Sequence, residues 1–236
     1  MPRMGDNLNK GAIARGEASH LGIPRVAQTR VHNVECRVAR VADSLEIARY
    51  MCAAGGGLYE FLFDDLIPFV TATEFLAAAV ASNRYPISYR NCFVAANNED
   101  GRVVGAANAF PATAIDSNES YPLVPRDRLD HIRPMLKLQE RDSLFLNALA
   151  VHENVRRQGV GTRLLSWAKL RALSLNRPSL SLHVWVDNTT ARDFYKNLGF
   201  IERGIAEIPS HPRLRHSGGS VLMSLAIQAE HGIADE

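Results

Sequence analysis

The sequence predicts a mixed α/β fold, and three observations support this class. Segments with strand and helix patterns alternate from residue 143 onward. Two short apolar runs in the first half are joined by Asn-Glu-Asp-Gly, which is typical of a hairpin turn. The chain has 236 residues, of which 46% are hydrophobic and 22% charged, as is ordinary for a globular protein. We expect a weakly ordered extension over residues 1–34 and a single domain over residues 35–230.

The first part of the chain predicts one strand followed by helices. Residues 35–42 alternate as a strand does, and Asp43 is placed to cap the helix that follows. That helix ends at the three consecutive glycines 55–57. A second helical segment, rich in aromatic residues, is expected over residues 58–69.

The next elements are a third helix and a hairpin. Thr71 and Glu74 have the spacing of a capping box in front of an apolar helix. Residues 91–97 and 101–110 are the two strands of the predicted hairpin. Residues 111–142 then form a long polar segment that contains proline, in which we expect one short helix. Loops of this length inside compact domains are usually functional or disordered.

The second half has the clearest organisation. Residues 143–151 form a strongly apolar strand, and an apolar stripe with helical spacing follows it. Another strand covers residues 179–186. Asn188 is placed to cap the next helix, which Gly199 closes. Residues 220–227 form the last predicted strand.

Composition excludes several classes of function. The net charge is +2 and no block of Lys and Arg occurs, so nucleic-acid binding is not expected. The apolar stretches are far shorter than the roughly 18 residues of a membrane span. Cys36, Cys52 and Cys92 are odd in number and widely spaced, so we expect neither a disulfide framework nor a metal site. Reduced cysteines fit the cytoplasm, and Asp6 and Glu17 argue against a transit peptide.

The stretch VRRQGVGTRLL, residues 155–165, predicts an anion site. It connects a strand to a helix, and the first N–H groups of a helix point outward without partners. Gly159 and Gly161 leave room for close approach of a phosphate, and Arg156 and Arg157 add charged donors at the rim. A diphosphate fits this chemistry, although a purely structural glycine turn is the alternative.

Two motifs resemble those of the GNAT (GCN5-related N-acetyltransferase) superfamily. Its acetyl-CoA-binding motif, R/Q-x-x-G-x-G/A, is matched by Arg156-Arg157-Gln158-Gly159-Val160-Gly161. Its second motif, N-x-x-A-x-x-F/L-Y followed by G-F, is matched at the usual interval by Asn188, Ala191, Phe194, Tyr195 and Gly199-Phe200. The resemblance covers about residues 35–228, but its specific part is confined to residues 143–204. It implies a mostly antiparallel sheet with an acetyl-CoA cleft between two splayed central strands.

The resemblance also implies which residues hold the cofactor. The backbone of Leu149, Ala150 and Val151 would pair with the pantetheine arm, and an N–H near Val151 would hold the oxyanion. The pyrophosphate would lie on Arg157, Gln158, Gly159, Val160, Gly161 and Thr162. Arg156 is either a ligand contact or a solvated surface residue. Asn188 is either a helix cap alone or a cap that also contacts the cofactor.

Tyr195 and His183 are the catalytic candidates that follow from the resemblance. A phenol is protonated at neutral pH, so Tyr195 could donate to the departing thiolate; an aromatic core residue is the alternative. His183 lies five residues before Asn188, where some peptide-acetylating relatives carry a Glu base. A structural strand histidine is the alternative. Glu140, Asn147, Glu60 or water could also take the proton of the amine.

The leading interpretation is an N-acetyltransferase that moves the acetyl group of acetyl-CoA to a primary amine by direct attack in a ternary complex. The alternative is a non-catalytic acyl-CoA-binding or sensor module of the same fold. The expected partner is an amine acceptor, with a homodimer as an open alternative to the monomer. The first helices and the segment 111–142, an insertion on the acceptor side, would wall the acceptor site. The sequence does not identify the acceptor.

Overall fold

A seven-stranded sheet organises the protein. The computed structural model describes residues 33–115 and 124–228, so residues 1–32 of the expected extension lie outside it. The strand order is β1-β2-β3-β4-β5-β7-β6. The strands are β1 Val34–Val38, β2 Cys92–Asn97, β3 Val103–Pro111, β4 Leu144–Val151, β5 Ser179–Trp185, β6 Ile201–Ala206 and β7 Ser220–Ala226. All neighbours pair antiparallel except β4 and β5, which are parallel. The mixed, mostly antiparallel sheet is thereby confirmed.

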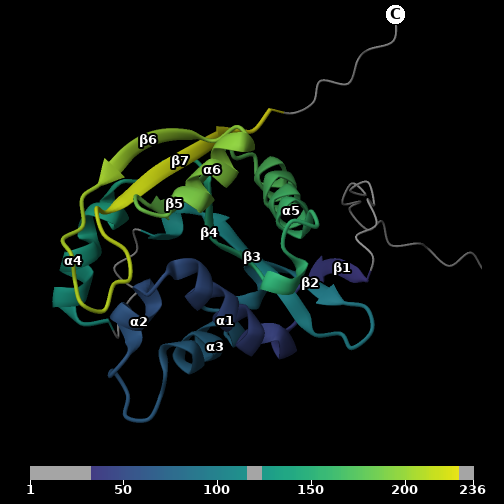
Figure 1. Cartoon of the computed structure of the whole chain (residues 1–236), viewed down its shortest axis with the longest axis horizontal. Helices are drawn as coiled ribbons and strands as arrows, with labels where there is room; N and C mark the ends of the chain where they lie inside the picture. The colour runs from purple at the N-terminus through teal and green to yellow at the C-terminus, as the bar shows by residue number, and fades with distance from the viewer. Residues whose placement is uncertain (1–32, 116–123, 229–236) are drawn as a thin grey trace, which may run out of the picture.

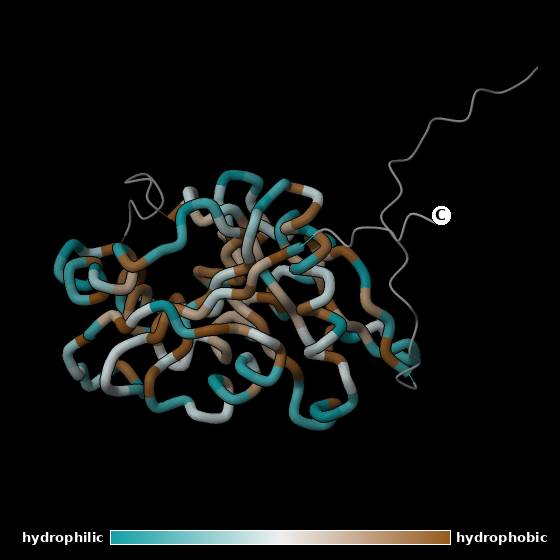
Figure 2. The backbone as a smooth tube through the Cα atoms, turned by 90° about the horizontal axis from the view of Figure 1, so that it is seen from above, coloured by the Kyte–Doolittle hydropathy of each residue, from teal (hydrophilic) through white to brown (hydrophobic). Residues whose placement is uncertain are grey.

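Helices cover both faces of the sheet. They are α1 Ser44–Gly55, α2 Leu58–Phe63, α3 Ala72–Ala81, α4 Arg126–Lys137, α5 Val160–Ser174 and α6 Thr189–Asn197. Helices α1 to α3 lie on one side of the sheet, and α5 and α6 lie on the other (Figure 1). One core forms between α1 to α4 and the sheet, and a second forms between α5, α6 and the sheet. Figure 2 shows hydrophobic segments running through the middle of the molecule, as expected when apolar burial drives folding.

Strands β4 and β5 separate soon after they meet. Their parallel pairing consists of Leu144 with Leu180 and Phe145 with Ser181, and no further pairs follow. In the ladder of β3 and β4, Asn108 faces Ala148 while Ala109 faces Leu146, so Asn147 is a bulged residue. A bulge bends its strand and is common beside active sites. The bend lies at the point where β4 leaves β5.

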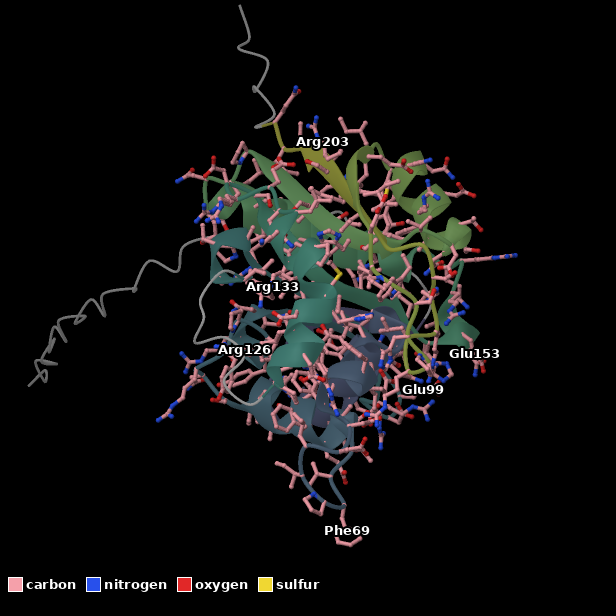
Figure 3. All side chains as sticks on the ribbon, turned by 90° about the vertical axis from the view of Figure 1, so that its left-hand side faces the viewer. Phe69, Glu99, Arg126, Arg133, Glu153 and Arg203 are labelled. Atoms are coloured by element: carbon pink, nitrogen blue, oxygen red, sulfur yellow. The ribbon has the colours of Figure 1, made fainter. Side chains whose placement is uncertain are left out.

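Most of the predicted elements are present, with five differences. The strand predicted over residues 35–42 is shorter, because β1 ends at Val38 and a short 3-10 helix spans Val41–Asp43. Helix α2 ends at Phe63 rather than at residue 69, and the Oδ1 atom of Asp64 accepts from the N–H of Ala72 at the start of α3. The loop between α2 and α3 projects from the body, with the fully exposed Phe69 at its tip (Figure 3). Helix α4 is a full 12-residue helix within the segment 111–142.

The other two differences concern a missed strand and a cap. Strand β6 was not predicted, because as an edge strand it is exposed along most of its length. Asp43 precedes α1 as expected but makes no cap hydrogen bond to it. Its carboxylate instead accepts from Arg37 at 2.7 Å and from the N–H of Arg40 at 2.7 Å. By contrast, the capping box of Thr71 and Glu74 at α3 is confirmed, with both of its hydrogen bonds present.

Candidate functional site

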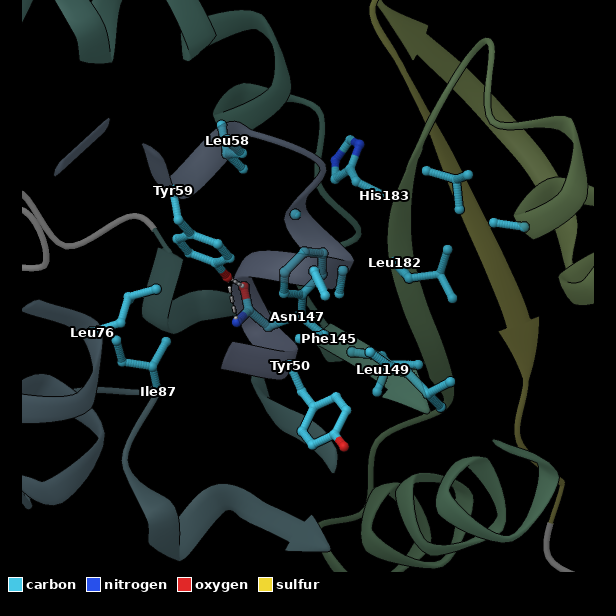
Figure 4. A pocket seen from close by; sticks show the side chains of 18 of the residues that line it. Tyr50, Leu58, Tyr59, Leu76, Ile87, Phe145, Asn147, Leu149, Leu182 and His183 are labelled. Carbon is cyan, nitrogen blue, oxygen red and sulfur yellow. Dashed lines mark hydrogen bonds between the residues drawn. The ribbon is translucent and has the colours of Figure 1, made fainter. Parts of the chain in front are cut away.

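A cavity of about 1340 Å³ opens where β4 and β5 separate. One part is lined by the ends of β4 and β5 and by the first turns of α5 and α6. The other part is lined by residues of α1 to α4. Figure 4 labels Leu149 of β4 and Leu182 of β5 on the two separated strands. The sheet therefore creates the site by failing to close.

The end of β4 offers backbone groups to a ligand. Leu149, Ala150 and Val151 all line the cavity, and on their other side they pair with β3. Toward β5 they have no strand partner, since the β4–β5 pairing stops at Phe145. Backbone N–H and C=O groups away from bulk water need partners. This edge can therefore pair with an extended, amide-containing chain.

The turn between β4 and α5 leaves the first amides of α5 free. Arg157 and Gly159 both adopt the left-handed conformation, with φ of 59° and 79°. This conformation turns the chain sharply into α5, for which Gly159 is the N-cap. Within the part of the chain that the structure describes, the N–H groups of residues 159–162 donate to no other residue, and no acid lies in the first turn. Together with the helix dipole, these free amides offer the donors that an anion would need, so the turn stays the candidate anion site.

The side chains of the turn are arranged unequally around this site. Arg156, Arg157 and Thr162 line the cavity. One donor of Arg156 is used, because its Nε donates to the carbonyl of Val151 at 3.1 Å. Gln158 instead donates to the carbonyl of Asn154 and does not line the cavity. Val160 is buried in the core, so only its backbone can face a ligand.

Gly161 keeps the cleft open beside the turn. A Cβ atom added here would lie 3.7 Å from the ring of Phe194 and 3.9 Å from the side chain of Leu149. Alanine would fit at ordinary contact distance, whereas a longer side chain would extend into the space between α5, α6 and β4. The absent side chain, the free amides and the arginines together fit a diphosphate.

Asn188 and Tyr195 lie at the opposite wall, on α6. The Oδ1 of Asn188 accepts from the N–H of Ala191 at 3.2 Å, which confirms the cap, and the residue also lines the cavity. Tyr195 is buried against Phe194 and Phe200, with its ring forming part of the cavity wall. Burial raises the pKa of its phenol above the ordinary value of about 10. The hydroxyl is therefore protonated throughout the physiological range.

His183 is held on both sides by the protein. Its Nε2 lies 2.8 Å from the carbonyl of Leu138, and because a carbonyl can only accept, the proton is on Nε2. Its Nδ1 lies 2.9 Å from the hydroxyl of Ser220, which can donate to it. Burial lowers the pKa of His183 to about 4. The ring lines the cavity, but Leu138 and Ser220 lie against its two nitrogens, so this geometry does not support its role as the base.

The weaker candidates for the base are also partly engaged. Glu140 accepts a hydrogen bond from the hydroxyl of Ser179. Glu60 lies 3.9 Å from the guanidinium of Arg215. Neither residue is among those that line the cavity. Asn147 does line it, but an amide is not a base at neutral pH.

A polar network around Asn147 was not predicted from the sequence. Asn147 Nδ2 donates to Asn108 Oδ1 and to the hydroxyl of Tyr59, each at 3.0 Å (Figure 4 shows the pair of Tyr59 and Asn147). Asn108 Nδ2 in turn donates to the carbonyl of Asn91 at 3.1 Å. Asn108 and Asn147 are each the one polar residue in an otherwise apolar strand. Buried polar side chains need hydrogen-bond partners, so this pattern could have indicated the network.

The described residues contain no group of three or more His, Cys, Asp or Glu side chains suited to a metal ion. In the same residues, no helix has the length and apolar character needed to cross a bilayer. The described lining of the cavity offers backbone amides, arginines, hydroxyls and aromatic rings to a ligand.

Comparison with known proteins agrees with this geometry. The profile of the acetyltransferase (GNAT) family matches residues 71–200. GCN5-related N-acetyltransferase 4, chloroplastic, of Arabidopsis thaliana is 26% identical over 221 residues, covering 89% of this chain and 73% of the relative. A solved acetyltransferase aligns with a TM-score of 0.59 and 23% identity, covering 82% of this chain and 100% of its own. An N-acetyltransferase from Staphylococcus aureus Mu50 aligns with a TM-score of 0.58 and 17% identity, covering 81% and 100%.

The state of His183 predicts a pH dependence of stability. A histidine with a pKa of about 4 in the folded protein and ~6.5 in the unfolded chain binds its proton preferentially when unfolded. Stability is therefore lost as the pH falls from about 6.5 toward 4. Between pH 7 and pH 5, protonation of this residue in the unfolded chain should lower the free energy of unfolding by about 2 kcal/mol. Urea unfolding of the wild type and His183→Gln at both pH values measures it, and equal pH slopes for the two would contradict this placement.

Gly161 predicts an effect on ligand affinity. A Gly161→Glu side chain would occupy the cleft beside the amides of α5 and place an anion where the diphosphate should lie. We expect the Kd for acetyl-CoA to rise at least about tenfold, which corresponds to ~1.4 kcal/mol. Titration calorimetry measures it, with Gly161→Ala as the matched control that should bind nearly as the wild type does. An unchanged Kd in folded Gly161→Glu would show that the phosphates bind elsewhere.

Proposed function

The chain belongs to the GNAT acetyltransferase family, and we propose that it transfers the acetyl group of acetyl-CoA to a primary amine by direct attack. The observation that carries this proposal is the opening between β4 and β5, which leads to the free amides of α5. Acetyl-CoA supplies an activated thioester, so the protein needs only to bind it, orient it and stabilise the charges that develop. No covalent enzyme intermediate is required, and none of the cysteines has a role in it.

The cofactor residues have separate tasks in this proposal. The amides of residues 159–162 hold the diphosphate, with Arg156 and Arg157 at the rim. The unpaired edge of Leu149 to Val151 binds the pantetheine amides. An N–H near Val151 stabilises the negative charge that forms on the carbonyl oxygen of the acetyl group. Such fixed donors act most strongly in a site that excludes water.

Tyr195 would stabilise the leaving thiolate. Its pKa is raised by burial, whereas a thiol ionises near ~8.5, so complete transfer of the phenolic proton is unfavourable. A hydrogen bond from the hydroxyl to the developing thiolate has no such cost and strengthens as charge forms. The role we propose is therefore donation toward the sulfur atom.

We propose that water takes the proton of the amine. An amine with a pKa near ~10 is mostly ammonium at neutral pH and must lose a proton before it attacks. His183 is neutral but has both nitrogens bonded, and Glu140 and Glu60 do not line the cavity. Solvent in the open part of the cleft then accepts this proton, and also the second proton that the nitrogen loses after its attack. The C–S bond breaks as the C–N bond becomes the amide, and CoA leaves as the thiolate, which takes up a proton from solvent.

The alternative is a module that binds acyl-CoA without turnover. It would use the same cleft, and it differs from the enzyme only in the fate of the thioester. We also propose a cytoplasmic location from the free cysteines, although the Arabidopsis relative is named chloroplastic. Imaging of the full chain fused to a fluorescent protein would distinguish the two compartments.

A screen of amine acceptors tests the proposed function. The protein and acetyl-CoA are incubated with single amines, and release of free CoA thiol is followed together with the mass of the acetylated product. We expect stoichiometric thiol and product for at least one acceptor class. Acetyl-CoA should also raise the Tm, because a ligand at a hundred-fold excess over its Kd stabilises by ~2.7 kcal/mol. A raised Tm without any turnover would favour the binding module.

Tyr195→Phe tests the proposed donor. The change removes one hydroxyl and keeps the ring, so the packing against Phe194 and Phe200 should survive. We expect turnover to fall by ~10²-fold, within the usual range for loss of one fixed hydrogen-bond donor to a developing negative charge. The Kd for acetyl-CoA should change little, since the hydrogen bond forms mainly in the transition state. Near-wild-type turnover would leave Tyr195 as a wall residue, and loss of folding would show that the hydroxyl is structural.

A further inference from the structure

The part of the cavity away from the α5 turn is lined mainly by apolar residues of α1 to α4 and of β3 and β4, with a few polar side chains, such as Tyr59, Gln139 and Asn147, among them. We call this part the apolar chamber and define it by Phe63, Phe75, Ile87, Phe110, Leu136 and Phe145, all of which line it. Phe110 and Phe145 are buried and belong to one hydrophobic cluster, with Ile87 and Leu136 packed against it. Phe63 and Phe75 stack with their ring centroids 4.8 Å apart. Helices α2, α3 and α4 thus hold a preformed hydrophobic space beside the end of the β4–β5 pairing.

Acidic side chains are scarce around this chamber. Among the described residues that line the whole cavity, only Glu74 and Glu153 are acidic. Glu153 lies in the turn before α5, on the diphosphate side. Glu74 accepts from the N–H and the hydroxyl of Thr71, in the capping box of α3. A multiply charged amine would find few partners here for its charges.

The acids that the sequence offered for a cationic acceptor do not face the chamber. Asp65 forms an ion pair with Arg213, and Asp64 accepts from the start of α3. Neither of them lines the cavity, and neither does Glu60. The described lining residues therefore offer few acidic partners for the charges of a polycationic acceptor.

Asn147 marks where the chamber meets the separated strands. Both hydrogens of its Nδ2 are used, toward Asn108 and Tyr59, which fixes the orientation of the amide. Its Oδ1 consequently turns away from Asn108, and its one recorded partner is the hydroxyl of Tyr59 at 3.3 Å. An sp² oxygen has two lone pairs, so it can accept one N–H of an incoming amine.

We propose that the acceptor is a primary amine attached to one bulky apolar group, aromatic or aliphatic, which enters the apolar chamber while Asn147 orients the amine. This inference rests on the proposed acetyl transfer. Burial of apolar surface supplies the binding free energy, and the single polar contact at the mouth of the chamber fixes the direction of the nitrogen. The same chemistry occurs in an arylalkylamine and in the N-terminal residue of a peptide with a large apolar side chain.

Matched acceptors test this preference. With acetyl-CoA, kcat/KM for 2-phenylethylamine should exceed that for ethylamine and for putrescine by about tenfold or more. A Phe-Ala-Ala peptide compared with Gly-Ala-Ala shows whether the apolar group is used in a peptide or only in a small amine. Turnover of putrescine or ethylamine at an equal or higher kcat/KM would overturn the inference and leave the proposed function intact. Preference for octanoyl-CoA without discrimination among amines would assign the chamber to the acyl chain instead.

Ala79→Phe tests the chamber itself. Ala79 of α3 lines the cavity, so the added ring should fill the chamber and lower the ratio of kcat/KM for 2-phenylethylamine over ethylamine by about tenfold. The matched control is Ala81→Phe, at an exposed position of the same helix outside the lining, which should keep the wild-type ratio. Calorimetric binding of 2-phenylethylamine to the complex with CoA provides a readout without turnover. Binding by wild type and Ala81→Phe but not by Ala79→Phe supports the chamber, and equal binding or no binding in all three overturns it.

Discussion

The site depends on one constraint, the separation of β4 from β5 after two residue pairs. The bulge at Asn147 makes this possible and also changes which side chains face each layer. Leu144 and Leu146 before the bulge pack in the core of α5 and α6, and so do Leu149 and Val151 after it, although the interval of three residues would otherwise reverse the face. The strand thus keeps its apolar face while its free edge turns toward the cleft.

Strand β5 forms the opposite wall of the cleft. Beyond Ser181 it no longer pairs with β4, and side-chain hydrogen bonds to other elements form a brace that holds it in place. Trp185 Nε1 donates to the carbonyl of Gly55 at 2.9 Å, which ties the end of β5 to α1. His183 bonds the end of α4 through Leu138 and strand β7 through Ser220. These contacts join β5 to its sheet neighbour β7 and to α1 and α4 on one face of the sheet, and they hold β5 at a distance from β4. His183 is better understood as part of this brace than as a titrating group of the reaction.

Local pattern predicted the mixed α/β class and an anion site before α5, since both depend on residues close in sequence. The resemblance to the GNAT motifs implied the mostly antiparallel sheet and the cofactor residues, and the cofactor contacts stay predictions. The turn after residue 155, the cap at Asn188 and the capping box at Thr71 each involve partners at most a few residues apart. The hydrogen bonds of His183 are made with Leu138 and Ser220. Those of Asn147 are made with Tyr59 and Asn108, and all four partners are distant in sequence. No periodicity encodes such pairings, which is why the bulge, the brace and the apolar chamber emerged only from the structure. Edge strand β6 was missed for a different reason, because its exposed residues lack the apolar run by which the other strands were recognised.

The uncapped start of α5 lowers the stability of the unliganded protein and leaves its first amides available to a ligand. The first amides of a helix have no partner within the helix, and in most helices a capping side chain binds one of them and contributes ~1 kcal/mol to stability. Here that contribution is withheld from the unliganded protein and becomes available only to an anion that occupies the turn. The first turn of α5 is therefore less stable than a capped turn would be, at the place where the ligand is expected to bind. A substitution that capped this turn would stabilise the fold and would compete with the ligand for the same amides. If acetyl-CoA binds at this turn as proposed, its binding stabilises the folded protein by mass action, and the free energy of unfolding then rises with the concentration of acetyl-CoA.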